Sequence, residues 1–265
     1  MKEEHAKGRM KMKQFKNVFK RVEKKYLLSE ETYHQLLNSL ESYMNVDEYG
    51  LHTICNIYYD TNQYDLIRHS IEKPPYKEKL RIRSYGIPTE ESTVFVEIKK
   101  KFKGVVYKRR ISMPLKKATL FLNHGIAPKE NSQIVNEIKY FIQLYHPVPK
   151  QYIAYDRIAL YGKEDPELRI TFDSNIRGRK EDLDLECGDD GEPLLSPGER
   201  LMEIKIAGAM PIWLAHLLSE LEIYPTSFSK YGNIYKKDVF LVPMIEKSMA
   251  NEYDISELRG GIVHV

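Results

Sequence analysis

Charged side chains recur at every second position in several stretches of this chain that otherwise have the composition of β-strands. Arg81 and Arg83 form one such pair, and Glu203 and Lys205 form another. Successive residues of a strand point to opposite faces, so each stretch has one charged face and one apolar face. If the apolar faces pack outward against helices, the charged faces look inward at one another. A barrel lined in this way with Arg and Lys needs an anion inside it.

Electrostatics limits where such a charged face can lie. Two like charges about 4 Å apart repel by roughly 4 kcal/mol at an effective dielectric constant near 20, and desolvation costs several kcal/mol more for each ion. A dry interior packed with cations is therefore excluded. The face is either the solvated side of an ordinary sheet or the wall of a wet cavity that concentrates a polyanion. Phosphate chains suit the second alternative, because Arg binds phosphate oxygens through two parallel hydrogen bonds and Lys supplies a mobile point charge.

Carboxylates are interleaved with the cations on the same faces, and they have two interpretations. The residues concerned are Glu23, Glu97, Asp173 and Glu203. As salt-bridge partners they would only neutralise neighbouring cations, and this alternative is open above all for Glu97 and Asp173. Otherwise one or two of them hold a hard divalent cation such as Mg²⁺ or Mn²⁺, which takes oxygen ligands and bridges to substrate phosphates. Such a cation would neutralise charge on a transferred phosphoryl group.

The elements that must position these residues follow from hydrophobic periodicity and from turn and cap residues. Strands are predicted at 15–28, 51–60, 77–85, 93–102, 105–113, 152–161, 168–175 and 201–207. Helices are predicted at 29–44, 114–125, 131–145 and 210–221, and 61–71 is predicted to be a short helix or a loop. The segment 227–231 is expected to lead into a short last strand or a loop. The predicted fold class is α+β, with an antiparallel barrel and helices packed outside. Residues 1–16 are expected to form a basic mobile tail, 17–240 the one domain, and 241–265 a C-terminal extension.

Composition and motifs exclude several other classes of protein. The two cysteines, Cys55 and Cys187, give neither a disulfide framework nor metal-site spacing. No apolar run of about 18 residues would span a membrane, and the Lys-rich N-terminus lacks the apolar region of a secretory signal, so a cytoplasmic protein is predicted. No Walker-type phosphate loop is present. The acidic stretch 181–192 is interpreted as a solvated hairpin rather than a Ca²⁺ loop, and nucleic acid ranks last as a partner, because inward-facing charge suits a narrow chain better than a duplex.

Several segments, in order along the chain, carry a resemblance to a known family. Arg21-Val-Glu23-Lys-Lys25 resembles a variant of the Glu-x-Glu-x-Lys signature of the triphosphate tunnel metalloenzymes. Five further segments resemble the VTC domain, which is the polyphosphate polymerase domain of the vacuolar transporter chaperone family. They are Tyr58-Tyr59-Asp60-Thr61, Leu80-Arg81-Ile-Arg83-Ser-Tyr85-Gly86, Val96-Glu97-Ile-Lys99, Met202-Glu203-Ile-Lys205 and Phe228-Ser229-Lys230-Tyr231. The resemblance spans about residues 19–235. No one motif is decisive, but together in this order they are specific.

The resemblance implies an eight-stranded antiparallel tunnel with helices outside, and transfer of the ATP γ-phosphoryl group to a growing polyphosphate with Mn²⁺ or Mg²⁺. By position, the residues that would contact phosphates are Lys25, Arg81, Arg83, Lys99, Arg157, Arg169, Lys205, Ser229 and Lys230, with Lys108 and Arg110 on a strand of less certain register. Of these, Arg81, Arg83, Lys99 and Lys230 would be catalytic. Glu203 would be the metal ligand, with Glu23 as a second carboxylate.

Departures from the family pattern leave alternatives open. Arg21 stands in place of the first Glu of the hydrolase signature, which removes a metal carboxylate and favours making the chain over cleaving it. Ser227 stands where eukaryotic relatives tend to carry a basic residue. The alternatives are a triphosphatase acting on inorganic triphosphate or nucleoside triphosphates, and a non-catalytic polyphosphate-binding module. ATP and polyphosphate are the expected partners, a membrane protein is a further candidate, and the oligomeric state is open.

Overall fold

Buried and exposed side chains alternate along the central strands, as the period of two in the sequence predicts. The computed structural model describes residues 21–103, 105–129 and 132–239. In β4 (Tyr76–Tyr85), Leu80 and Ile82 are buried on one face, and the residues between them lie on the other. Apolar residues at this spacing fit a pleated surface that is packed on one side. The charged residues of such a strand therefore share the opposite face.

The described residues form ten strands and a set of helices. The strands are β1 (Arg21–Leu28), β2 (Met44–Val46), β3 (His52–Asp60), β4, β5 (Thr93–Phe102), β6 (Val105–Pro114), β7 (Val148–Gly162), β8 (Arg169–Arg179), β9 (Glu192–Pro193) and β10 (Arg200–Ala207). The helices are α1 (Glu30–Leu40), α2 (Asp65–Ile71), α3 (Leu115–His124), α4 (Gln133–Tyr145) and α5 (Ile212–Glu220), and residues 230–239 are also helical. The α+β class is thereby confirmed. Within the described ranges, no helix has the length and apolar character needed to cross a membrane.

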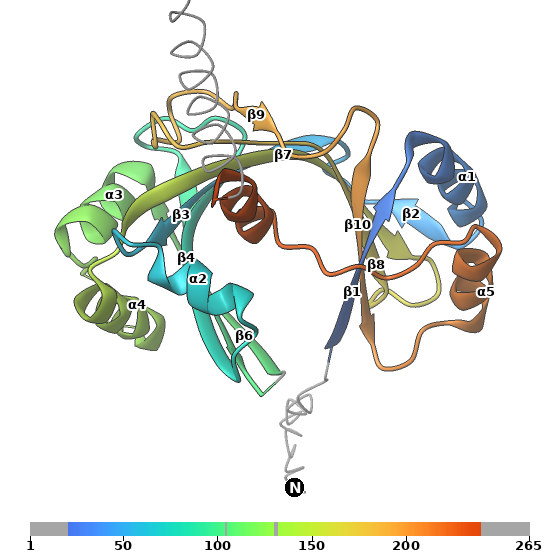
Figure 1. The fold of residues 1–265 in the computed structure, drawn as a ribbon, viewed down its shortest axis with the longest axis horizontal. Helices are drawn as coiled ribbons and strands as arrows, with labels where there is room; N and C mark the ends of the chain where they lie inside the picture. Colours follow the sequence, from blue (N-terminus) through green and yellow to red (C-terminus); the bar gives the residue numbers. More distant parts are fainter. Residues whose placement is uncertain (1–20, 104, 130–131, 240–265) are drawn as a thin grey trace, which may run out of the picture.

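Eight of the strands follow one another in the order β1-β10-β8-β7-β3-β4-β5-β6, and neighbours are antiparallel. The sheet curves into an arch whose edges are β1 and β6 (Figure 1). Among the described residues no backbone pairing joins these edges. The ammonium of Lys108 on β6 nevertheless lies 3.2 Å from a carboxylate oxygen of Glu23 on β1. One ion pair between side chains, rather than a backbone ladder, therefore bridges the two edges at this point.

The apolar faces of the strands pack outward against two groups of helices (Figure 1). α3 and α4 bring Phe121 and Phe141 into one buried cluster with Ile98 of β5. α1 and α5 cover the other half of the sheet, where Leu36 belongs to a cluster with Phe172 of β8. Fully burying an apolar side chain of this size contributes roughly 1.5–3 kcal/mol. Because the helices take up the outer face, the charged side chains are left for the inner face.

The helix predicted at 29–44 is shorter than the sequence indicates. It ends at Leu40, and Met44–Val46 pairs with β7 as the strand β2, which the sequence did not predict. The ring of Tyr43 stacks on the ring of Trp213 in α5, with ring centres 4.1 Å apart. These contacts join distant parts of the chain, so they cannot be predicted from local helix propensity.

β7 starts at Val148, earlier than the predicted residue 152, although Pro149 falls within it. Pro149 lies opposite Tyr59 where the register between β3 and β7 shifts, a place where a missing N–H group is tolerated. β8 likewise continues to Arg179, beyond the predicted end at 175. Positions 15–20 of the predicted first strand, the predicted tail 1–16 and the extension 241–265 lie outside the described residues.

Residues 230–239 are helical, so the prediction that 227–231 leads into a short last strand or a loop is wrong. The Ser229 side-chain oxygen caps this helix by accepting a backbone N–H bond from its first turn. The Tyr231 hydroxyl donates to the buried carboxylate of Asp60 at 2.9 Å. Asp60 also accepts three backbone N–H bonds at the start of α2. One buried carboxylate therefore joins β3, α2 and the last helix.

Two arginines organise the acidic stretch 181–192. Arg179 donates to the carbonyl oxygens of Asp182, Asp184, Gly188 and Asp190. Arg177 donates to both the carbonyl and the carboxylate of Asp189. Carbonyl groups that point at a guanidinium are poorly placed for Ca²⁺, so this arrangement favours the hairpin interpretation.

Replacing Asp60 with Ala should lower the free energy of unfolding by about 2–4 kcal/mol, because four donors lose a buried acceptor. Urea denaturation followed by circular dichroism measures the change. Asp65→Ala at the exposed start of α2 is the matched control, and it should cost less than about 1 kcal/mol. Wild-type stability of the Asp60→Ala protein would contradict this role.

Candidate functional site

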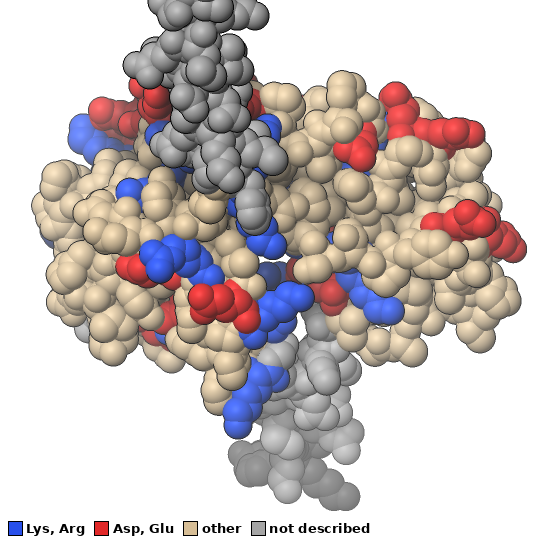
Figure 2. Space-filling model, viewed as in Figure 1, with Lys and Arg blue, Asp and Glu red and all other residues tan. Residues whose placement is uncertain are grey.

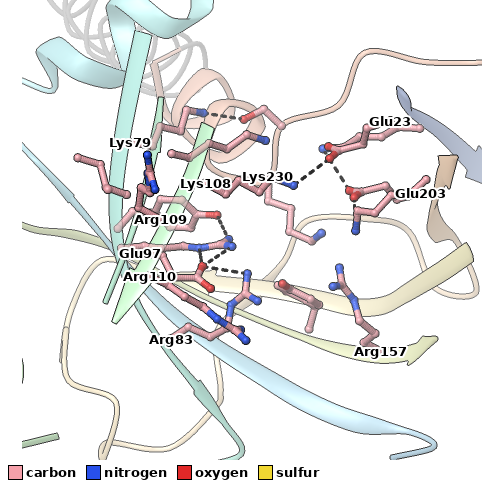
Figure 3. Close-up of a pocket in the computed structure, with 18 residues that line it drawn as sticks. Glu23, Lys79, Arg83, Glu97, Lys108, Arg109, Arg110, Arg157, Glu203 and Lys230 are labelled. Carbon is pink, nitrogen blue, oxygen red and sulfur yellow. Dashed lines mark hydrogen bonds and ion pairs between the residues drawn. The ribbon is translucent and has the colours of Figure 1, made fainter. Parts of the chain in front are cut away.

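The concave side of the sheet encloses a cavity of about 460 Å³. Eleven Lys or Arg side chains but only three carboxylates line it. The predicted site residues on its wall are Lys25, Arg81, Arg83, Lys99, Lys108, Arg110, Arg157, Lys205, Ser229 and Lys230, together with Glu23 and Glu203. In Figure 3 the labelled side chains come from opposite parts of the arch and point into one space. A cavity of this charge is suited to a polyanion.

Strand register places three lysines in one row across neighbouring strands. Lys79 on β4 lies opposite Lys99 on β5, and Lys99 lies opposite Lys108 on β6. Like charges directly opposite each other destabilise a sheet. All three side chains line the cavity, where water or a bound anion can screen them. We therefore expect the row to mark a position of negative charge on the ligand.

Glu97 acts as the salt-bridge partner of the two arginines of β4. Its carboxylate accepts from two nitrogens of Arg81, both at 2.7 Å, and lies 3.3 Å from a nitrogen of Arg83. Arg81 also donates to the hydroxyl of Tyr58 at 3.0 Å. These bonds fix the direction of the guanidinium groups, so the salt-bridge interpretation of Glu97 is the one that the geometry favours.

Asp173 is likewise a salt-bridge partner that orients cations, on the opposite side of the cavity. Its two oxygens accept from Arg157 at 2.6 and 2.8 Å, and one of them also accepts from Lys230. Burial by itself would raise the pKa of Asp173, but the charges of Lys230 and Arg157 hold that pKa well below its usual range. The ring of Tyr155 supports both cations, with its centre 5.1 Å from the Arg157 guanidinium and 4.1 Å from the Lys230 ammonium. Asp173 is therefore fully engaged in holding cations.

Glu203 and Glu23 are the carboxylates of the cavity wall that remain for a metal ion. Glu203 lies 2.6 Å from the ammonium of Lys205 and 3.8 Å from that of Lys25. Burial works to raise the pKa of Glu203, but these two lysines outweigh it and lower the pKa to about 2. Glu23 pairs with Lys108, and its pKa is also lowered, against the opposing effects of burial and of Glu203. Both groups are ionised at neutral pH.

This pair fits a hard divalent cation that is shared with a phosphate ligand. Mg²⁺ is commonly bound through one or two carboxylates and completes its shell with substrate phosphates and water. In the described part of the chain, no three or more His, Cys, Asp or Glu residues gather to hold a metal ion. A cation held by protein ligands alone therefore does not fit, whereas one held between Glu203, Glu23 and a phosphate chain does.

Lys79 is a cavity residue that the sequence motifs missed. Its ammonium donates to the hydroxyl of Ser229 at 3.2 Å, and among the described residues it forms no ion pair with a carboxylate. Burial, aided by the charges of Lys77 and Lys99, lowers the pKa of Lys79 to about 7. Burial likewise lowers the pKa of Lys99 to about 8. The signal for Lys79 was present in the sequence, because the period of two extends one step back from Arg81.

A second cavity of about 1100 Å³ adjoins the first. Lys108, Arg110, Arg157 and Lys205 line both. Arg169 lies only in the second cavity, so it is the one predicted phosphate contact that the structure does not bring into the central cavity. Beyond the four shared cations, the charged side chains that the second cavity adds are Arg169 and three carboxylates, so the positive charge is concentrated in the central cavity.

The affinity for tripolyphosphate should fall as the pH rises through about 7, because Lys79 loses its proton there when no anion is bound. A bound polyanion raises that pKa again, so binding near pH 8 should take up protons. Calorimetry in two buffers with different ionisation enthalpies measures this uptake. Lys79→Arg stays charged and should reduce the uptake, whereas Lys163→Arg on the surface should not. Equal uptake by wild type and Lys79→Arg would contradict the prediction.

The stability that Glu203 contributes should be present above pH 4.5, its ordinary pKa, and should be lost as the pH falls through about 2. The difference in the free energy of unfolding between wild type and Glu203→Gln should therefore be greatest near neutrality and shrink in acid. Urea titrations across this pH range measure it, with Glu31→Gln as an exposed control. A difference that is constant with pH would show that the ion pairs of Glu203 carry no such contribution.

Comparison with known proteins connects this geometry to a family. The model of the VTC domain matches residues 20–237. A Bacillus halodurans protein assigned as an adenylate cyclase is similar in structure, with a TM-score of 0.51 and 15% identity over 79% of this chain and 93% of that one. HpAC1 from Hippeastrum, which is described as having a dominant triphosphatase activity, gives a TM-score of 0.51 and 16% identity over 82% of this chain and 96% of its own.

At such identities the two structures show a shared fold and nothing more. No curated protein matches the sequence. The family match is of a different kind, because it covers nearly all the described residues and confirms the resemblance carried by the charged strand motifs. The chain belongs to the VTC domain family and has the fold of a triphosphate tunnel.

Proposed function

We propose that this protein is an ATP-dependent polyphosphate polymerase. The observation that carries the proposal is the excess of positive charge around the central cavity, where Lys and Arg side chains far outnumber carboxylates. A triphosphate has three phosphoryl groups to neutralise, whereas eleven cations line the central cavity alone. A binding site for a longer chain would use this extent of charge, and membership of the VTC domain family supports the same substrate class.

In the proposed reaction a terminal oxygen of the polyphosphate attacks the γ-phosphorus of ATP. The bond from that phosphorus to the β–γ bridging oxygen breaks, and ADP leaves. Arg81 and Arg83, which Glu97 holds in place, would bind the terminal phosphates. Lys230, held by Asp173, would neutralise charge on the leaving group. Positioning and electrostatics suffice for phosphoryl transfer, without a covalent enzyme intermediate.

A divalent cation is part of the proposal, with Glu203 and Glu23 as the residues that would hold it. When bound, such a cation supplies charge neutralisation at phosphate oxygens. Lys25 and Lys205, which neutralise Glu203 in the structure, would then be released to contact phosphates. Comparing the rates with Mn²⁺ and with Mg²⁺ identifies the preferred cation.

Two other functions use the same cavity. A triphosphatase would direct water instead of a phosphate chain at the terminal phosphorus, and the fold shared with HpAC1 makes this the first alternative. A binding module would hold polyphosphate without turnover. Arg21 in place of the first signature Glu argues against the hydrolase, because that carboxylate would be a further metal ligand.

Incubation of the purified protein with ATP and Mn²⁺ or Mg²⁺ should give phosphate chains longer than tripolyphosphate on a polyacrylamide gel. Arg81→Ala and Glu203→Ala should each reduce the rate about 100-fold or more, because each removes a preorganised charge at the reacting phosphates. The matched controls are Arg68→Ala and Glu220→Ala on exposed helix positions, which should retain the wild-type rate.

The other functions give different products. Release of orthophosphate from ATP or tripolyphosphate without longer chains would identify a triphosphatase. Tight polyphosphate binding with no turnover, unchanged by Glu203→Ala, would identify a binding module. Either result from folded protein rejects the polymerase.

A further inference from the structure

Three strand ends meet at one exposed end of the sheet, beyond the residues that line the two cavities. Tyr76 at the start of β4 lies opposite Phe102 at the end of β5, and Phe102 lies opposite Val105 at the start of β6. We call the hairpin tip the set of exposed apolar side chains there, which are Tyr76, Phe102, Val105, Val106 and Tyr107. Phe102 is 47% exposed and Tyr107 is 50% exposed. A cluster of large apolar side chains in water marks a surface that binds something.

Lysines surround the hairpin tip. Lys77 and Lys101 are directly opposite each other in the next register position. Lys103 holds its ammonium 5.5 Å from the ring centre of Phe102, and Lys73 precedes β4. Figure 2 shows basic side chains gathered at the lower edge of the molecule, over the end of the β5–β6 hairpin.

These charges are not neutralised by neighbours. Among the described residues, Lys73, Lys77, Lys101 and Lys103 form no ion pair with a carboxylate. Glu78, the acidic residue within the start of β4, points to the helix side, where it bonds the Tyr145 hydroxyl and lies near Lys100. The ammonium of Lys77 donates to the backbone carbonyl of Ser70 at 2.9 Å, and burial, followed by the charges of Lys101 and Lys73, lowers the pKa of Lys77.

The combination of apolar and basic side chains at the hairpin tip indicates what kind of partner it binds. A soluble polyanion would engage the lysines but would leave the valines and aromatic rings in water. An anionic bilayer satisfies both sets, because aromatic rings favour the headgroup level and lysines are attracted to anionic lipids. We propose that the hairpin tip docks the protein on an anionic lipid surface, with Phe102 and Val106 entering the interface and the lysines lying over the lipid phosphates. This proposal is independent of the reaction in the tunnel.

Cosedimentation of the full chain with phosphatidylcholine vesicles, with and without phosphatidylserine, tests the proposal. Wild type should bind the anionic vesicles more strongly than the neutral ones. F102S/V106S should reduce binding to anionic vesicles about tenfold or more, through lost apolar burial. K101E/K103E should do the same through lost attraction to lipid phosphates. The Lys-rich residues 1–20 are present in every variant, so differences between variants report the hairpin tip.

Matched changes elsewhere serve as controls. Ile212, which is 75% exposed on α5, and Lys139 on α4 supply I212S and K139E, and both should bind like wild type. Unchanged thermal melts of all variants exclude unfolding as a cause. Wild-type binding by F102S/V106S would overturn the proposal, whatever the lysine variants do. A loss confined to K101E/K103E would show attraction to the anionic lipids without apolar insertion, which also contradicts the proposal.

Discussion

Repulsion among like charges is the constraint on which this structure depends. Lys79, Lys99 and Lys108 face one another across three strands, and nothing in strand pairing itself favours that placement. The sheet tolerates this placement because its inner face is exposed to water and because carboxylates lie among the cations. Asp173 and Glu97 neutralise the arginines that need a fixed direction, whereas in the row of lysines only Lys108 forms an ion pair with a carboxylate among the described residues.

The outer face of the same strands supplies the stability that offsets this repulsion. Ile98 and Phe172 alternate with charged neighbours, and each packs into a cluster under helices on the convex side. One period of two in the sequence thus gives both a buried face and a binding face. The two requirements are linked, because a shift of register by one residue would bury the charges and expose the core.

The strands and the charged inner face could be predicted because both depend on local alternation. The last helix could not, because its start is fixed by contacts of Tyr231 with Asp60, more than half the chain away. The strand β2 depends in the same way on a distant partner, because it forms by pairing with β7. Lys79 was missed for a different reason, since the family motif begins at Leu80 although the physical pattern begins earlier. Arg169 was assigned to phosphate by its position in the family pattern, but it lies at the beginning of its strand, beyond the central cavity.

The seam between β1 and β6 has a topological consequence. A closed ladder of backbone hydrogen bonds would make the wall a ring, and a polymer could then enter or leave only by threading an end through it. Here Lys108 and Glu23 span the seam, and an ion pair that is partly exposed contributes only about 0–1 kcal/mol. Separating it would let a chain slip out sideways at any point along its length. For the proposed polymerase, processivity on a long polymer would then depend on ionic strength as well as on the distance to a free end.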